Sequence, residues 1–226
     1  MEISVDNIIY DNILKGISLK IKKGNITSII GPNGSGKTIL LECIANIRNI
    51  TEGKITDLED KKIVLVKQNL LDSFFCDTIE KEIELTLEEF NYPREKINKR
   101  INDSLKMIGL PDYFLKRDPM TLSSSELRLV ALARALSVNP DIIMLDEPTI
   151  GMTTIEINNL IQIIKKIKRR YNKTIILVTQ DVELVHKVSD YIYVIKNGKN
   201  FVEGDKYSVF KQTELLEKNG ITVPLI

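Results

Sequence analysis

A glycine-rich segment at residues 31–38 carries the residue types that bind a chain of phosphates. Glycines let the backbone wrap closely around an anion, because they tolerate positive φ and present no side chain. Free N–H groups at the start of a following helix attract phosphate. Lys37 would reach the β- and γ-phosphates, and Thr38 would offer its hydroxyl to Mg²⁺. Taken alone, the segment is also compatible with a glycine-rich turn that contains an incidental lysine. Its residues are Gly31, Pro32, Asn33, Gly34, Ser35, Gly36, Lys37 and Thr38.

Two adjacent carboxylates form a second candidate for chemistry. Asp146 and Glu147 directly follow the apolar run 142–145. Two carboxylates at the end of a buried strand are costly unless a cation or a polarised water meets them. Asp146 therefore suits Mg²⁺ binding, and Glu147 suits the base that orients an attacking water. The alternative is a strand-end turn with ordinary solvated acids, and the nearby phosphate-binding segment argues against it.

Composition limits the classes of protein to which the chain can belong. Its 226 residues fit one large domain or a domain with a subdomain. The net charge of +1 gives no overall field that would indicate nucleic acid. Cys43 and Cys76 lack CxxC spacing and indicate buried thiols in a reducing compartment. No signal-peptide pattern or bilayer-length apolar run occurs. We therefore expect a cytosolic protein without nucleic-acid partners, which could still dock on a membrane protein.

Hydrophobic patterning indicates the elements that must position these residues. Short apolar runs rich in β-branched residues predict strands, and repeats of three or four residues predict helices. Because apolar strands alternate with helices, we expect an α/β protein with a parallel sheet. The charged helical stretch 78–116 reads as an insertion between strands. The predicted strands are 2–9, 17–22, 26–30, 54–57, 63–66, 142–145, 175–178, 191–195 and 201–202, and the predicted helices lie at 39–45, 78–116, 121–135 and 154–170.

These motifs, in this order, resemble those of the ATPase subunits of ATP-binding cassette (ABC) transporters. The resemblance covers nearly the whole chain and is carried by residues 31–38, Gln68, 122–126 and 142–149. It implies the fold of a P-loop NTPase (RecA-like), with a mixed sheet, an antiparallel β subdomain and a helical subdomain insertion. It also implies ATP and Mg²⁺ as cofactors, and a transmembrane transporter subunit and a second ABC ATPase subunit as partners.

The resemblance implies one ABC ATPase domain over 1–226. In this division, 1–70 and 138–226 form the nucleotide-binding core, and about 72–137 forms the helical signature subdomain. The protein would then sit peripherally on the cytoplasmic face of the cell membrane.

The resemblance assigns roles to two residues that the phosphate-binding pattern does not include. Tyr10 is similar to the aromatic residue that stacks on adenine, and such stacking is worth ~1–3 kcal/mol per base. Gln68 is similar to the loop glutamine that senses Mg²⁺ and the attacking water and contacts the transmembrane partner. Without the family, Tyr10 is equally a core tyrosine at a strand end, and Gln68 is a polar residue after a strand.

Residues 122–126 resemble the family signature loop, which usually reads Leu-Ser-Gly-Gly-Gln. In the family this loop faces ATP held by the opposite subunit, so hydrolysis requires a dimer. Ser123 and its neighbours Ser124 and Ser125 would occupy this position here, with two serines in place of the glycines. Glu126 replaces the glutamine and adds negative charge. Ser123 and Glu126 taken alone form a capping box for the next helix.

Two further positions depart from the family pattern. Gln180 stands where a histidine is expected, and it can donate a hydrogen bond to a γ-phosphate oxygen but cannot carry charge. Thr153 stands where an aspartate is expected after Gly151-Met152. The catalytic residues would thus be Glu147, Gln180 and Gln68, with Thr38, Gln68 and Asp146 at the metal. Since the altered positions serve the dimer interface, we expect a heterodimer with a more typical ATPase subunit, although a homodimer remains open.

Two segments are similar to the energy-coupling-factor group of importers, namely 74–79 and 215–224. The resemblance therefore implies an ATP-hydrolysing subunit that powers such an importer, working as a dimer with ATP at the interface. A groove between the helical insertion and the main sheet would receive a helix of a membrane subunit. The alternatives are a weakly hydrolytic regulatory subunit of an ABC heterodimer and a soluble, non-transport ABC ATPase. A generic P-loop kinase would not explain Gln68 or 122–126.

Overall fold

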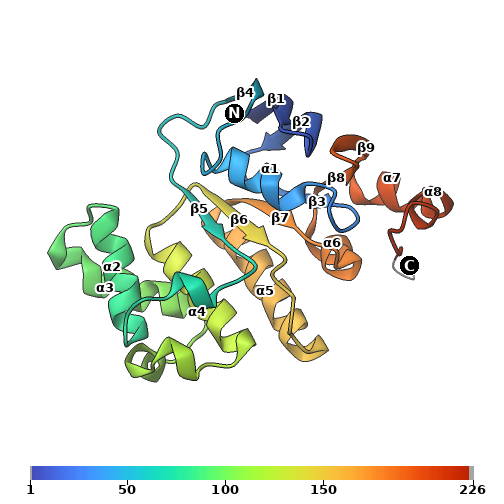
Figure 1. Cartoon of the computed structure of the whole chain (residues 1–226). Helices are drawn as coiled ribbons and strands as arrows, with labels where there is room; N and C mark the ends of the chain where they lie inside the picture. The colour runs from blue at the N-terminus through green and yellow to red at the C-terminus, as the bar shows by residue number, and fades with distance from the viewer. Residues whose placement is uncertain (1, 224–226) are drawn as a thin grey trace.

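Strands and helices alternate along the chain and build two sheets (Figure 1). The computed structural model describes residues 2–223. The strands are β1 (Glu2–Tyr10), β2 (Leu14–Lys22), β3 (Ile26–Ile30), β4 (Glu52–Thr56), β5 (Ile63–Val66), β6 (Ile142–Asp146), β7 (Thr174–Val178), β8 (Tyr191–Lys196) and β9 (Lys199–Gly204). The helices are α1 (Lys37–Ile44), α2 (Ile79–Glu89), α3 (Arg94–Ile108), α4 (Ser124–Ser137), α5 (Thr154–Tyr171), α6 (Val182–Val188), α7 (Lys206–Phe210) and α8 (Thr213–Glu217).

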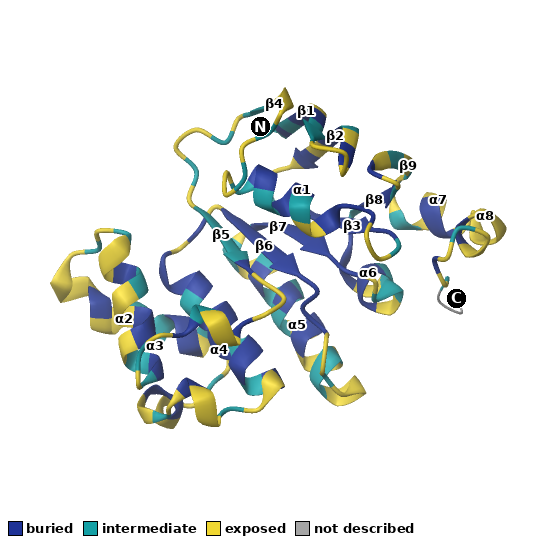
Figure 2. Ribbon diagram, in the orientation of Figure 1, coloured by how far each residue is buried: buried dark blue, intermediate teal, exposed yellow. Residues whose placement is uncertain are grey.

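The larger sheet has the strand order β5-β6-β7-β3-β8-β9. Its first five strands pair in parallel, and β9 pairs antiparallel with β8. β3, β6 and β7 are buried along their whole length (Figure 2), as in a parallel sheet covered on both faces. The α/β class with a mixed sheet is therefore confirmed. The Asn197–Gly198 turn folds β9 back on β8, as this dipeptide predicts.

A smaller antiparallel sheet, in the order β2-β1-β4, lies over one face of the larger sheet. Apolar residues of β1 and β2 share a buried cluster with α1 and that face of the larger sheet. The opposite face shares a second cluster with helices α2 to α6. β3 thus contributes to both clusters, through Ile30 and Ile29, and α1 packs in the cluster that it shares with β1 and β2.

Helices α2, α3 and α4 lie between β5 and β6 in the chain and beside the larger sheet in space (Figure 1), which confirms the predicted helical insertion. The continuous helical pattern over 78–116 is interrupted, because Asn91 has a φ of 56° and Pro93 precedes the first residue of α3. The helix predicted over 121–135 begins at Ser124 instead. Ser123 caps it, and its last residue is Ser137.

Near the C-terminus, α7 packs on β8 and β9, and the side chains of Phe210, Leu216 and Ile221 are buried. His186 of α6 is half-buried, with its ring 5.7 Å from that of Phe210. The C-terminal segment singled out in the sequence includes Pro224, which lies outside the described residues. Within residues 2–223, no helix combines the length and the apolar character that crossing a membrane requires.

Candidate functional site

The loop between β3 and α1 is a tight turn that requires glycine at two positions. A Cβ at Gly31 would lie 2.1 Å from the carbonyl oxygen of Ile195, and a Cβ at Gly36 would lie 2.7 Å from Cδ2 of Leu14. Gly36 also has a φ of 99°, which disfavours other residues. The loop is therefore held against β8 and β2. The first N–H groups of α1 have no partner within the helix and are available to an anion.

Lys37, the first residue of α1, is buried and turns back over the loop. Its Nζ donates to the carbonyl oxygens of Gly31, at 2.8 Å, and Pro32, at 3.0 Å. Burial lowers the pKa of Lys37, and the nearby carboxylates of Glu147 and Asp146 oppose this shift. A buried ammonium whose hydrogen bonds reach only carbonyl groups gains free energy when an anion approaches. The arrangement therefore favours binding of a phosphate group at the loop.

Thr38 and Asp146 meet beside this loop. The Thr38 hydroxyl donates to both carboxylate oxygens of Asp146, at 2.9 Å and 3.2 Å. Burial raises the pKa of Asp146, and the Thr38 hydrogen bond partly opposes this effect. A hydroxyl and a desolvated carboxylate are hard oxygen donors that fit Mg²⁺. Within residues 2–223, no cluster of three or more His, Cys, Asp or Glu residues could enclose a metal, so water and phosphate oxygens would complete its coordination.

Glu147 is held in a fixed orientation at the end of β6. Its Oε2 accepts hydrogen bonds from the Thr179 hydroxyl, at 3.0 Å, and the Gln180 backbone N–H, at 3.1 Å. Its backbone is left-handed, with φ of 46°, and its N–H donates to the Val178 carbonyl at 2.8 Å. Left-handed backbone at a non-glycine residue costs of order 1–3 kcal/mol and is concentrated at functional sites. Among the described residues, no hydrogen bond reaches Oε1, so this oxygen is available to a ligand.

A cavity of about 490 Å³ is lined by Lys37, Thr38 and Glu147, while Asp146 reaches it only through its hydrogen bond with Thr38. Gln68, which follows β5, and Gln180, which follows β7, are both exposed at its wall. The Gln180 side-chain amide donates to Oδ1 of Asn33 and so closes over the phosphate-binding loop. The site residues that the structure brings to this cavity are Asn33, Gly34, Ser35, Gly36, Lys37, Thr38, Gln68, Glu147 and Gln180.

Other predicted site residues lie outside this cavity. Tyr10 does not line it. Its hydroxyl accepts a hydrogen bond from Arg48 at 2.9 Å, and the Arg48 guanidinium lies 5.6 Å from its ring centroid. Ile13, a short distance along the chain, lines the cavity instead. The predicted adenine contact of Tyr10 stays a prediction.

The signature segment, Ser123 to Ser125, lies at the start of α4 and away from the cavity of its own chain. The expected capping box is present, since the Ser123 hydroxyl accepts from the Glu126 N–H and Glu126 accepts from the Ser123 N–H. Arg117 donates to Oε1 of Glu126 at 2.7 Å. The negative charge of Glu126 is therefore paired within the chain.

Sequence reasoning missed two residues that support Glu147. The buried Arg128 of α4 donates to the carbonyl oxygens of Glu147, at 3.3 Å, and Ile150, at 3.2 Å. Thr179 holds the Glu147 carboxylate. The sequence held a signal for Arg128, because it is a charged residue within the apolar stretch that forms α4. A buried charge needs polar partners, so such an arginine could have been predicted to bind nearby carbonyl groups. Two buried polar atoms, Oγ of Ser35 in the loop and Nε of Arg128, lack a partner among the described residues.

Comparison with known proteins finds that the chain is similar to ATP-binding proteins of transporters. The family model for the ABC transporter matches residues 14–150. The chain is 32% identical to the energy-coupling factor transporter ATP-binding protein EcfA of Methanocaldococcus jannaschii, over 95% of this chain and 81% of that protein. It is 31% identical to EcfA2 of Clostridium acetobutylicum, over 100% of this chain and 87% of that protein.

Solved structures agree with the sequence comparison. CbiO1 from Clostridium perfringens, part of the ABC transporter complex CbiONQ, superimposes with a TM-score of 0.84 at 26% identity, over 96% of this chain and 93% of that one. An ATP-binding cassette solved as a dimer in a post-hydrolysis state, bound to ADP and Pi, superimposes with a TM-score of 0.77 at 30% identity. That match covers 90% of this chain and 98% of the other.

Proposed function

The chain belongs to the ABC transporter family, and from this membership we propose that it is the ATP-hydrolysing subunit of an energy-coupling-factor importer. The names of the relatives EcfA and EcfA2 support this assignment. So does the likeness to CbiO1, which belongs to a transporter complex. In this proposal residues 1–70 and 138–226 form the nucleotide-binding core, and about 72–137 form the helical signature subdomain.

The observation that carries the proposal is that one cavity is lined by Lys37, Thr38, Gln68 and Glu147, and that Asp146 is hydrogen-bonded to Thr38. Lys37 would bind the β- and γ-phosphates of ATP, and the loop amides would hold the rest of the triphosphate. Thr38 and Asp146, with Gln68, would hold Mg²⁺, which neutralises the charge that develops on the phosphate oxygens. The hydrogen bond between Thr38 and Asp146 supports these metal ligands, and the Ser35 hydroxyl, which has no partner among the described residues, supports phosphate binding in the loop.

Glu147 would act as the base for hydrolysis. Because Thr179 and Gln180 occupy Oε2, we assign proton acceptance to Oε1. The water oxygen bonds to the γ-phosphorus, the bond from that phosphorus to the bridging oxygen breaks, and Oε1 takes the proton. ADP and inorganic phosphate leave. Gln180 would release Asn33 and donate its amide hydrogen to a γ-phosphate oxygen.

A transmembrane subunit would dock in a groove of about 390 Å³ beside β5 and α2. Its wall is apolar at Val64, Leu85 and Phe90, and the ring of Phe75, 81% exposed, stands at its margin. Because Gln68 lines the nucleotide cavity and its neighbour Lys67 lines this groove, Gln68 is placed to report on both sites. The protein would therefore be peripheral on the cytoplasmic face of the cell membrane, attached through this partner.

The second ATPase subunit would bring its own signature loop to this chain's nucleotide. Ser124 and Ser125 in place of glycines, Thr153 in place of aspartate and Gln180 in place of histidine support a heterodimer with unequal sites. The same departures favour one alternative, a nucleotide-binding subunit that hydrolyses weakly and regulates its partner.

Two substitutions test the proposal. Lys37→Ala should abolish measurable Mg²⁺-dependent ATP binding by the purified chain, because the β- and γ-phosphates lose their cation. Glu147→Gln should preserve ATP binding and lower turnover of the assembled transporter by about 10²-fold or more, within the range typical of a general base. Isothermal titration and phosphate release are the measurements.

Lys20→Ala, on β2 and remote from the cavity, is the matched control for loss of a lysine. ATP binding that survives Lys37→Ala would contradict the nucleotide site. Transporter turnover unchanged by Glu147→Gln would contradict a hydrolytic role and favour the regulatory alternative.

A further inference from the structure

Tyr10 is the last residue of β1, and the turn that follows it reaches the nucleotide cavity. The Tyr10 carbonyl oxygen accepts a hydrogen bond from the N–H of Ile13 at 3.0 Å, and Tyr10 pairs with Leu14 across the turn. Ile13 lines the cavity, and the side chain of Leu14 lies against Gly36 of the phosphate-binding loop. The backbone of Tyr10 is therefore fixed next to the phosphate-binding loop.

Arg48, shortly after α1, holds the side chain of Tyr10. Its Nη1 donates to the Tyr10 hydroxyl at 2.9 Å, and its guanidinium carbon lies 5.6 Å from the centroid of the Tyr10 ring. At that distance the guanidinium binds the ring at its hydroxyl end rather than across its face. The ring is only partly buried, so this hydrogen bond restricts rotation of the side chain that packing alone would leave free.

Glu42 of α1 holds Arg48 through both its backbone and its side chain. The Glu42 carbonyl oxygen accepts from the Arg48 N–H at 3.2 Å, and Oε2 of Glu42 accepts from Nε of Arg48. The Glu42 side chain is 13% exposed, whereas that of Arg48 is 40% exposed. Charge-assisted hydrogen bonds of this kind fix the orientation of a guanidinium. Arg48 is thus held in place by Glu42 and presents a fixed donor to Tyr10.

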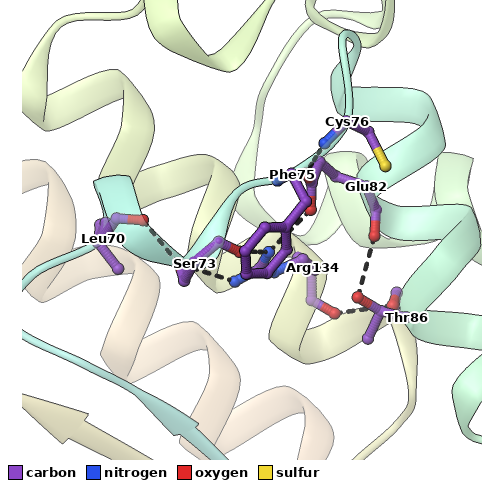
Figure 3. A network of polar contacts seen from close by, with 8 residues as sticks. Leu70, Ser73, Phe75, Cys76, Glu82, Thr86 and Arg134 are labelled. Atoms are coloured by element: carbon purple, nitrogen blue, oxygen red, sulfur yellow. Dashed lines mark hydrogen bonds and ion pairs between the residues drawn. The ribbon is translucent and has the colours of Figure 1, made fainter.

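The chain combines the same groups a second time, between α2 and α4. Figure 3 shows Arg134 of α4 paired with Glu82 of α2, at 3.0 Å, and the guanidinium lies 4.3 Å from the ring centroid of Phe74. That ring is 4% exposed and carries no polar atom, so the arginine there stabilises the core. Tyr10 differs because its ring is partly exposed and the arginine binds its hydroxyl. The Arg48 pair therefore orients a side chain near the surface.

We propose that Arg48, held by Glu42, is the positioning residue for Tyr10 and keeps its ring in the orientation that stacks on the adenine base of ATP. Neither Arg48 nor Glu42 lines the cavity, so the pair acts on the base and not on the phosphates. A ring that is already held in place loses less conformational freedom when a base stacks on it, and it binds the base more tightly. The inference rests on the proposed function and on the predicted stacking by Tyr10.

Isothermal titration of the full chain with Mg²⁺ and either ATP or inorganic tripolyphosphate tests the assignment, because tripolyphosphate has the phosphate chain but no base. Tyr10→Ala should weaken ATP binding by about 5-fold to 150-fold, the range for one stacked base. Arg48→Ala should weaken it by about twofold to tenfold, because the ring stays but is no longer held in place. Both variants should bind tripolyphosphate as tightly as the wild type does.

Tyr10→Phe removes only the hydroxyl, and it tests the same contact if Arg48→Ala does not fold. It should weaken ATP binding as much as Arg48→Ala does, and the double variant should bind no more weakly than either single variant. Arg100→Ala is the matched control, because the Arg100 guanidinium lies 5.9 Å from the ring centroid of Tyr92 and neither residue lines the cavity. It should leave the binding of both ligands unchanged.

Equal ATP affinity in Arg48→Ala and the wild type would overturn the inference. An equal loss of affinity for ATP and tripolyphosphate would also overturn it, because the effect would then not concern the base. Additive losses in the double variant would show that Arg48 does not act through the Tyr10 hydroxyl. If the wild type binds neither ligand, the proposed function fails and the inference falls with it, whereas the other outcomes leave the phosphate site intact.

Discussion

At the scale of single residues, Glu126 shows how a departure from a family pattern is accommodated. Arg117 pairs with its carboxylate and also donates to the Thr121 carbonyl oxygen at 3.3 Å. The Arg117 hydrogen bond, followed by that of the Ser123 N–H, lowers the pKa of Glu126 from its usual 4.5. The negative charge of Glu126, which would repel a phosphate of ATP bound to the partner subunit, is therefore already paired with Arg117 within the chain.

The lowered pKa of Glu126 has a consequence for acid stability. A carboxyl group whose pKa is depressed by folding stabilises the native state above its unfolded pKa, and the contribution disappears as pH falls through the folded pKa. Glu126→Gln should therefore be slightly less stable than the wild type near pH 7, and the difference should shrink below the usual carboxyl pKa and vanish once pH falls below the lowered pKa of the folded state. Urea unfolding at a series of pH values measures it. Equal stability at all pH values would contradict the pairing.

Removal of Arg117 should have a functional effect that a second substitution reverses. Arg117→Ala leaves the charge of the Glu126 carboxylate unpaired, near the place proposed for the phosphates of the partner's ATP. ATP-driven association of the two ATPase subunits should therefore weaken by about fivefold to tenfold, as expected for repulsion by a partly screened charge. Adding Glu126→Gln should restore association. Sedimentation of the mixed subunits with Mg²⁺ and ATP measures this, and a double variant as weak as Arg117→Ala would show that Arg117 acts by packing alone.

At the scale of elements, helix starts carry much of the site. Thr153 caps α5, because its hydroxyl accepts from the Glu156 N–H and Glu156 accepts from the Thr153 N–H. The hydrogen bond from the Thr153 amide, followed by the Ser125 hydroxyl, lowers the pKa of Glu156. Thr153 therefore stabilises the start of α5 as its N-cap, although it stands where the family pattern has an aspartate.

Substitution of Thr153 separates these two roles. Thr153→Ala should destabilise the protein by about 1 kcal/mol through loss of the cap, whereas Thr153→Asp should retain the stability because aspartate is an equally good cap. Thermal unfolding of the three proteins checks this. If Thr153→Asp is as unstable as Thr153→Ala, N-capping does not account for the contribution of Thr153 to stability.

At the scale of the whole molecule, unequal sites should appear in turnover. The purified chain alone should hydrolyse ATP slowly and without cooperativity, because each site of a homodimer would face a signature with Ser124 and Ser125. Adding the second ATPase subunit should raise turnover by about tenfold or more, an effect of order 1.4 kcal/mol on the barrier. Brisk, cooperative hydrolysis by the chain alone would contradict the heterodimer.

The sequence predicted the fold class and most elements because their signals are local. The phosphate-binding loop and the Asp146–Glu147 pair each depend on a few consecutive residues. The missed features join distant segments: Arg134 and Glu82 are 52 positions apart, and Thr179 holds a carboxylate 32 positions away. Nor could composition show that Arg117 pairs with Glu126, since any surface glutamate can be solvated.

The order of the larger sheet leaves β5 as an edge strand. Within residues 2–223, no other strand pairs with its outer N–H and C=O groups, and Ile63 and Val64 are only partly buried. Such an edge can template strand addition between chains, which is the first step toward aggregates. Lys61, Lys62 and Lys67 stand at its two ends and oppose that addition through charge repulsion. A cell that makes this chain without its transporter would therefore rely on those lysines to keep it dispersed.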